Sequence, residues 1–226
     1  MATRNISQIY DLMEFVVRKY KGGSFVTIDE AMETLDTAQL TCLEEWFAPY
    51  GENQILHDAI LPFKIDYVFV SDVSGRVTYP SDYLHLVSNV YTSIGSTRNK
   101  VTFKNEDEWV DATNSQLRAP SATAPIARDV SKYNSSTGVN DGGFVIFPFT
   151  LQAGTFTYLQ RPPTPVYAYT QVGRVVTYDP ANSVQLQWTD AFVNKVIAKA
   201  LKYWGIDLDE QGVSAFAESM DKENSV

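Results

Sequence analysis

Cysteine is almost absent from this chain of 226 residues, in which Cys42 is the only one. A single cysteine excludes an internal disulfide and a metal site built from several cysteines. Cys42 lies among apolar neighbours in a segment of helical pattern, where a thiol is usually a packed hydrophobic group rather than a nucleophile. The two histidines, His57 and His85, occur in unrelated contexts and lack a His-Glu-x-x-His spacing.

Motifs of the common enzyme classes are also missing. The chain has no Gly-x-Ser-x-Gly elbow and no glycine-rich loop of the kind that holds phosphates. Adjacent acids, such as Glu44 with Glu45 or Asp107 with Glu108, point in different directions on a helix or strand and make poor acid/base partners. The sequence therefore predicts no enzymatic activity, no metal and no cofactor.

Long apolar runs and basic residues are scarce as well. No segment reaches the roughly 18 apolar residues needed to cross a bilayer, and the first residues lack the apolar core of a signal peptide. There are 18 Lys and Arg against 27 Asp and Glu, which gives a net charge of −9. Because proteins that hold DNA through its phosphates carry basic surfaces, a sequence-reading DNA-binding protein is disfavoured. We expect a soluble protein that is synthesised in a cytoplasm.

Aromatic residues, in contrast, are abundant, with 13 Tyr and 12 Phe. They are compatible with a β-rich core and equally with interfaces, where aromatic side chains are enriched.

Hydrophobic periodicity predicts helices in the first third of the chain. Apolar residues recur every three or four positions over Ile6–Tyr20, as on one face of a helix. Thr27 and Glu30 have the spacing of a capping box, which begins a helix. The same spacing recurs at Asp36 and Gln39 and indicates a further helix start.

The C-terminal part has the same character. The pattern predicts a helix over Asp190–Trp204, capped by Thr189 or Asp190 and closed by Gly205. A last helix is expected to begin after Asp209.

The middle of the chain has strand-like patterns. Phe144–Phe147 and Thr155–Leu159 flank Pro148 and predict a hairpin. Proline cannot donate to a sheet, so Arg161–Pro165 predicts a stiff extended corner, followed by a third strand at Val166–Tyr169. Further strands are expected at four places: Ile65–Val70, Arg76–Tyr79, Arg174–Tyr178 and Val184–Trp188.

Two segments of the middle are harder to assign. Pro80–Val87 has features of a helical turn, since Leu84, Val87 and Tyr91 suit one face. Residues 92–142 are polar and long for a loop, which indicates a projecting hairpin or a segment ordered by a partner.

These patterns together predict an α+β fold. Residues 1–63 form a helical unit, and residues 64–188 form a central, mostly antiparallel β-sheet from which residues 92–142 project. Residues 189–226 form C-terminal helices that pack back, so that the three parts make one integrated domain.

Part of the N-terminal third carries charge of one sign only. From Gly22 to Phe63 there are eight acids and no Lys or Arg. Acids at helix N-termini and a solvated helix face explain such a run, and a surface that must remain negative explains it as well.

Several short motifs along the chain carry a resemblance to known proteins. The main ones are Tyr79-Pro-Ser-Asp-Tyr-Leu-His-Leu86, the apolar run that ends in Pro148, and Tyr158-Leu-Gln-Arg-Pro-Pro163. Shorter ones are Gly23–Ile28, Tyr50–Asn53, Leu61–Phe63, Trp188–Asp190 and Gly205–Leu208. Together they resemble the head–tail connector proteins, also called adaptor or ring proteins, of short-tailed phages, and most closely those of crAss-like phages. Residues 92–142 match none of these proteins. At Gln160-Arg161 the family tends to have a basic pair, and here only one residue is basic.

The resemblance implies a structural virion protein at the head–tail junction. Such proteins form a homo-oligomeric ring, usually twelve-fold, that contacts the portal protein and other connector or tail proteins. Double-stranded DNA passes through the ring without specific binding, and an acidic lining would repel its phosphates. The candidate channel-facing acids are Glu30, Glu33, Glu44 and Glu45. The candidate subunit-interface residues are Tyr158, Arg161, Pro162, Tyr167 and Tyr169.

A second hypothesis belongs to another class of protein. A carbohydrate- or receptor-binding β-rich virion module would use surface Tyr and Trp as stacking platforms. That reading accounts for the aromatic content and the acidity, but it leaves the helices at both ends of the chain unexplained.

Overall fold

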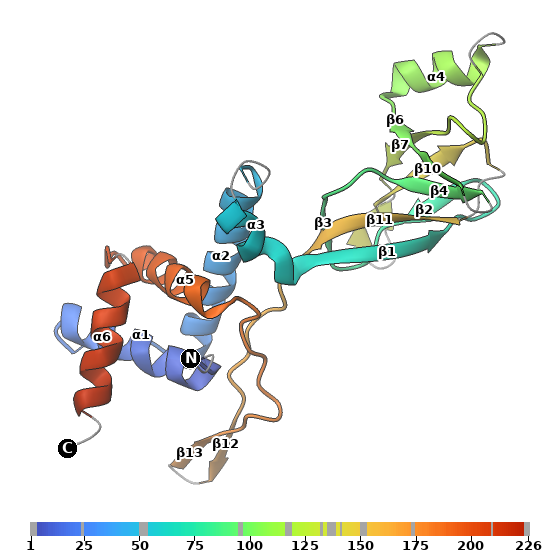
Figure 1. Ribbon diagram of the computed structural model, residues 1–226. Coiled ribbons are helices and arrows are strands. Elements are labelled where there is room, and N and C mark those ends of the chain that lie inside the picture. Colours follow the sequence, from blue (N-terminus) through green and yellow to red (C-terminus); the bar gives the residue numbers. More distant parts are fainter. Residues whose placement is uncertain are drawn as a thin grey trace. The chain divides into compact units, whose positions relative to one another are not determined.

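The computed structural model describes residues 4–23, 25–49, 54–94, 97–115, 119–131, 133–134, 139–140, 142–149, 153–172, 175–208 and 210–223. The chain forms two compact units, which are drawn in Figure 1. The helical unit combines Met1–Pro62 with Pro162–Val226, and the β unit is Phe63–Arg161. The fold is α+β, as the sequence predicts, with helices at both ends of the chain and antiparallel sheets between them.

The described part of the helical unit contains five α-helices. They are α1 (Ile6–Tyr20), α2 (Ile28–Phe47), α3 (Gln54–Ile60), α5 (Asp190–Tyr203) and α6 (Glu210–Glu223). The predicted capping box is present at the start of α2, where Thr27 accepts from the Glu30 amide and Glu30 accepts from the Thr27 amide. Gly205 ends α5 with a φ of 75°, a value that suits glycine. Asp209 lies outside the described residues.

These helices bury their apolar stripes against one another. The helix α5 packs on α2 and also contacts α1 and α6. Ile197 of α5 is fully buried, and so are Ile9 and Val16 of α1. Aromatic rings add edge contacts, with Trp46 of α2 lying 5.2 Å from Trp188, centroid to centroid. The prediction that α1 and α5 are neighbours in one core is confirmed.

The second helix start, predicted at Asp36, is wrong. The helix α2 runs without interruption through this position. The Gln39 side chain is buried and donates to the Asp36 carboxylate at 2.9 Å and to the Pro163 carbonyl oxygen at 3.0 Å. Asp36 and Gln39 have the spacing of a capping box, but they interact inside a helix. The second partner of Gln39, Pro163, is distant in the sequence, so the local pattern does not reveal this role.

The β unit consists of two main sheets and a helix. The first sheet has the order β1 (Lys64–Val70), β11 (Ala153–Gln160), β4 (Tyr91–Ile94) and β5 (Thr97–Lys100), with β3 (Tyr83–Leu86) also paired to β11. The second has the order β2 (Arg76–Thr78), β10 (Gly143–Phe147), β7 (Ile126–Val130) and β6 (Thr102–Phe103). Only β6 and β7 pair in parallel among these strands of the described chain. The remaining elements of the unit are α4 (Glu106–Asn114), η1 (Leu61–Phe63) at its boundary, and the short pair β8 (Tyr133–Asn134) and β9 (Val139–Asn140).

The hairpin predicted around Pro148 is not formed. Its two strands, β10 and β11, belong to different sheets. Both carry buried aromatic residues, and Phe144 of β10 lies 5.9 Å from Phe156 of β11, centroid to centroid. Two strands that each bury an apolar face gain more by facing each other across a core than by pairing edge to edge. Gly154 permits close packing in that core, because an added Cβ would lie 2.4 Å from the Phe69 ring and 2.2 Å from the Tyr91 carbonyl oxygen.

Two ambiguous segments are resolved by the same core. The helical turn considered for Pro80–Val87 is absent, and Tyr83–Leu86 is strand β3. The described part of residues 92–142 does not project as one excursion, because it contributes strands and a helix to the β unit. Val101 and Ala127 from this part belong to the buried core.

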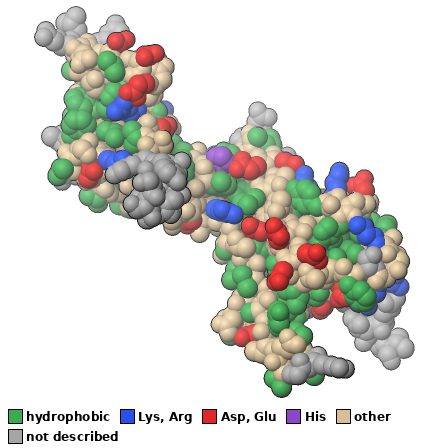
Figure 2. Space-filling view, turned by 180° about the vertical axis from the view of Figure 1, so that it is seen from behind, with side chains coloured by type: hydrophobic (Ala, Val, Ile, Leu, Met, Phe, Trp, Pro, Cys, Tyr) green, Lys and Arg blue, Asp and Glu red, His purple; other side chains and the backbone are tan. Residues whose placement is uncertain are grey.

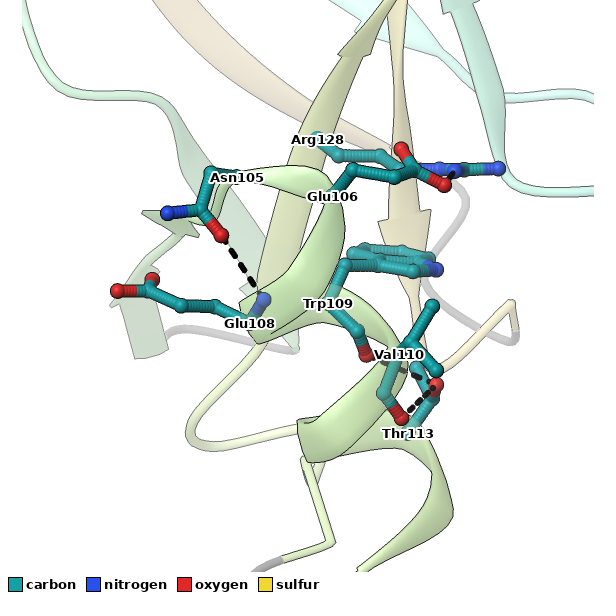
Figure 3. Close-up of polar contacts among 7 residues, drawn as sticks. All are labelled: Asn105, Glu106, Glu108, Trp109, Val110, Thr113 and Arg128. Atoms are coloured by element: carbon teal, nitrogen blue, oxygen red, sulfur yellow. Dashed lines mark hydrogen bonds and ion pairs between the residues drawn. The ribbon is translucent and has the colours of Figure 1, made fainter.

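The helix α4 shows how this polar stretch orders itself. Asn105 caps the helix by accepting from the Glu108 amide at 2.8 Å. Arg128 of β7 forms an ion pair with Glu106 and lies over the Trp109 ring, 5.3 Å from its centroid. Figure 3 shows these side chains converging between the helix and β7. One buried tryptophan therefore anchors α4 although most of its other residues are exposed.

Candidate functional site

The most distinctive surface of the molecule is a β-hairpin that projects from the helical unit (Figure 1). It consists of β12 (Tyr169–Val172) and β13 (Val175–Tyr178), which pair in an antiparallel register with Tyr169 opposite Tyr178 and Val172 opposite Val175. We call the described residues 166–172 and 175–184, which include this hairpin, the arm. The third strand predicted at Val166–Tyr169 is absent as such, and so is the strand at Val184–Trp188. Those segments contribute one isolated bridge, between Val166 and Val184.

The base of the arm is fixed to the helices by specific contacts. The Tyr167 ring lies between Tyr10 of α1, at 5.5 Å, and Tyr178, at 4.9 Å between centroids. The Gln185 amide group donates to the Tyr178 hydroxyl at 2.9 Å, and its oxygen accepts from the Ile6 amide at 2.6 Å. These contacts attach the base of the arm to the start of α1 and to Tyr10.

Toward the tip, the arm has exposed apolar side chains. Val172 is 80% exposed, Val175 65% and Val176 50%. The hairpin pairs with no third strand of the described residues. A two-stranded hairpin is at best marginally stable alone in water, and exposed β-branched residues indicate a binding surface. Figure 2 shows hydrophobic side chains along the arm.

The predicted interface residues fall into different parts of the structure. Tyr167 and Tyr169 belong to the arm, and Tyr169 is 47% exposed. Pro162 is buried in the helical unit. Tyr158 is buried in the β unit, and Arg161 is an exposed residue at the end of that unit.

Tyr158 is a core residue, which makes it unavailable to a partner. Its hydroxyl donates to the Asp82 carboxylate at 3.0 Å. Burial, with the hydrogen bond to Asp82, raises the pKa of Tyr158 to about 12. The Arg161 amide donates to the Asp82 carbonyl oxygen at 2.7 Å. The two longest motifs of the sequence analysis, Tyr79–Leu86 and Tyr158–Pro163, thus meet at Asp82.

The acids of α2 form a second surface. Glu30, Glu33 and Glu44 recur at intervals that place them on one exposed face of the helix. Hydrogen bonds from the Thr27 backbone and hydroxyl lower the pKa of Glu30 below its ordinary value. Glu45 is not included in this face, since its carboxylate pairs with the Lys199 ammonium at 2.5 Å. The name acidic face is used below for Glu30, Glu33 and Glu44.

Cys42 is buried, and this burial raises the pKa of its thiol to about 12. A thiol with that pKa is protonated at neutral pH and is a poor nucleophile. No group of three or more potential metal ligands occurs within the described part of the chain. None of its helices is long and apolar enough to span a membrane.

The sequence predicts one strand of the arm, because the strand expected at Arg174–Tyr178 corresponds to β13 (Val175–Tyr178). Its pairing in a hairpin with Tyr169–Val172 was not predicted, although the sequence contains a signal for it. Tyr169–Val172 and Val175–Tyr178 are two short β-like runs separated by two residues that begin with Gly173, which is typical spacing for a tight hairpin.

Comparison of the chain with models of known protein families finds no match, and comparison with curated protein sequences finds none either.

Proposed function

We propose that this chain is a structural virion protein that forms a ring between portal and tail, joins the capsid vertex to the tail and surrounds the DNA channel. The observation that carries the proposal is the arm, a base-anchored hairpin whose apolar tip is exposed in the single chain. A surface of this kind requires a partner. The resemblance to ring proteins supplies the kind of assembly, in which the partners are further copies and the neighbouring connector proteins.

Ring closure follows from the type of contact. When one surface of a subunit binds a different surface of the next, the chain of contacts either closes into a ring or extends into a filament. The arm is suited to such a head-to-tail contact because it is a projection and therefore not self-complementary. From Val166 to Tyr178 the sequence has one charged residue, Arg174, so docking of this segment would involve mainly uncharged side chains.

The acidic face is proposed to line or border the channel. Repetition of Glu30, Glu33 and Glu44 around a ring multiplies their field, and a negative lining disfavours adhesion of DNA phosphates. Glu45 contributes less to this field, because Lys199 compensates its charge.

Native mass spectrometry with negative-stain imaging tests the assembly. We expect closed rings of one subunit number for the wild type. The triple variant Val172→Ser, Val175→Ser, Val176→Ser should stay monomeric with an unchanged circular dichroism spectrum, because all three side chains are exposed. The control places serine at Val110, which is also exposed and lies in the β unit, and this variant should still assemble. A wild type that remains monomeric at high concentration would falsify the proposal.

Retention of DNA tests the acidic face. Rings of Glu30→Lys, Glu33→Lys, Glu44→Lys are expected to bind duplex DNA, with an affinity that falls steeply as salt rises, whereas wild-type rings should not bind. The control makes the same charge change at three exposed acids of α4, which are Asp107, Glu108 and Asp111. Equal DNA binding by both variants would show that net charge, rather than the acidic face, is responsible.

The alternative, a carbohydrate- or receptor-binding module, has weaker support. A hollow of about 320 Å³ on the outer face of the first sheet is lined in part by Asp66, Tyr91 and Arg98, which are suitable groups for a sugar. However, the Asp66 carboxylate already accepts from the Thr157 hydroxyl at 2.6 Å. Most rings of the β unit pack on one another, for example Tyr79 on Tyr83 at 3.9 Å between centroids, so few remain as stacking platforms.

A further inference from the structure

A second exposed apolar surface lies on strand β1 and the turn that follows it. Val68 is 70% exposed, Val70 74% and Val73 93%. Of the exposed large hydrophobic side chains in the described chain, more than half belong either to this segment or to the arm. The two segments also share their chemistry, since both present mainly β-branched aliphatic residues and both lack charge at these positions.

The strand β1 is also an unprotected sheet edge. It pairs along its whole length, from Lys64 to Val70, with β11 on one side, and no described strand pairs with its other side. Proteins normally protect such an edge with a proline, a bulge or inward-pointing charge. The β1 register has no irregularity and the strand has no proline. Its charged residues, Lys64 and Asp66, lie in the first half of the strand.

The arm has the matching property. Its two strands pair only with each other among the described residues, so each also has a free edge. In the register of the hairpin, Val172 and Val175 are directly opposite and therefore lie on the same face. On β1, Val68 and Val70 lie on one face because side chains alternate along a strand.

We infer that the arm of one copy adds as further strands to the free edge of β1 of a second copy. In this arrangement Val172 and Val175 lie beside Val68 and Val70 on one face of an extended sheet. Backbone hydrogen bonds of the added strand supply the affinity, as in other cases of strand addition, and the paired valines set the register. The inference rests on the proposed function, since it names the contact that links one ring subunit to the next.

A second copy is the occupant that the chain itself indicates. Each copy carries one donor segment and one acceptor segment, so an open chain of copies always leaves one arm and one edge exposed. Closure of a ring covers every arm and every edge at once. An unrelated partner would cover only one of the two apolar segments and would leave the other in water.

Disulfide trapping between separately prepared variants tests the contact. One preparation carries Val68→Cys and the other Val172→Cys, so that any mixed disulfide joins two copies. Cys42 can remain, because it is buried with a thiol pKa of about 12. After mixing and mild oxidation, we expect a dimer linked between positions 68 and 172, identified by mass spectrometry of the linked peptides. The control mixes Val172→Cys with Val110→Cys, whose position is exposed on α4, and should give little dimer.

A charge pair gives an independent test that does not depend on oxidation. Val70→Lys combined with Val172→Lys in one chain places like charges at the proposed contact and should abolish assembly. Val70→Lys combined with Val172→Glu should restore it, because the charges then attract. Both positions are exposed, so the subunits should fold normally.

The outcomes separate the inference from the function. Rings that form while position 172 links to position 110 as readily as to position 68 would refute strand addition and leave the ring proposal standing. The absence of any assembly in the wild type would refute both. Rings that persist in the Lys/Lys variant would also refute the contact.

Discussion

The buried amide of Gln39 gives a quantitative test of how the arm is attached to the helices. Its side chain is fully buried and donates to the Asp36 carboxylate and to the Pro163 carbonyl oxygen. Pro163 precedes the arm, so this hydrogen bond joins α2 to the start of the arm segment. Gln39→Leu keeps most of the side-chain volume and removes both donated hydrogen bonds.

The expected loss of stability follows from the two groups to which Gln39 donates. A net contribution of about 0.5–1.5 kcal/mol is typical of a neutral hydrogen bond, and about 1.5–3 kcal/mol of one to a charged group. Asp36 is partly exposed, which places its bond near the low end. The Gln39 Oε1 atom is buried without a hydrogen-bond partner among the described residues, and leucine removes that cost of about 1 kcal/mol or more. We therefore expect Gln39→Leu to lower the free energy of unfolding by about 1–2 kcal/mol.

Urea denaturation followed by circular dichroism and tryptophan fluorescence measures this loss. Trp46, Trp188 and Trp204 lie in the helical unit and Trp109 in the β unit, so Trp109→Phe gives a background in which fluorescence reports the helical unit alone. The control is Gln8→Leu, because the Gln8 amide bonds only within the exposed first turn of α1, and it should cost less. If Gln39→Leu unfolded at the same urea concentration as the parent, the hydrogen bonds would be unimportant and the reasoning wrong.

The remaining predictions concern packing, reactivity, pH and backbone space. Ile197→Asp should prevent stable folding of the helical unit because it buries an unpaired charge, whereas Ile197→Val should cost only about 0.5–1.5 kcal/mol in the same urea assay. Cys42 should resist iodoacetamide in the native protein and react fully in urea, and rapid native labelling would contradict its burial. The lowered pKa of Glu30 adds stability that is complete above the ordinary glutamate pKa and is lost as the pH falls through the lowered value. The stability difference between wild type and Glu30→Gln should therefore shrink in acid, and a difference that grows would reverse the assignment. Gly143→Ala should destabilise the β unit, since an added Cβ would lie 2.2 Å from the Val77 carbonyl oxygen, and an unchanged melting temperature would argue against that close approach.

Local sequence was sufficient for the helices and for the fold class. The bounds predicted for α1 are those of the structure, and the capping box at Thr27 and Glu30 begins α2 as expected. Helix hydrogen bonds join residues four apart, and caps act within one turn, so the information lies in adjacent residues. Some strands, such as β1, were also predicted, because an alternating pattern is a property of a single segment.

The candidate site could be predicted only in part. Tyr167, Tyr169 and Tyr158 were all selected from the sequence as aromatic residues in strand-like segments. Tyr167 and Tyr169 lie on the arm, whereas Tyr158 is buried. An aromatic residue in an alternating strand looks the same whether its face meets a core or a solvent boundary. The acids of α2 were identified from charge alone, but the compensation of Glu45 by Lys199 depends on a contact between α2 and α5.

The sequence by itself determined where helices begin and end, which faces are apolar and that the chain is α+β. Tertiary structure alone decided the strand partners, since Lys64 of β1 pairs with Leu159 of β11 and the hairpin expected around Pro148 separates into two sheets. It also decided that β12 and β13 pair with no third strand among the described residues. The physical reason is the range of the interactions. Strand pairing and core packing depend on which apolar faces meet across long stretches of chain, and no local pattern encodes that choice.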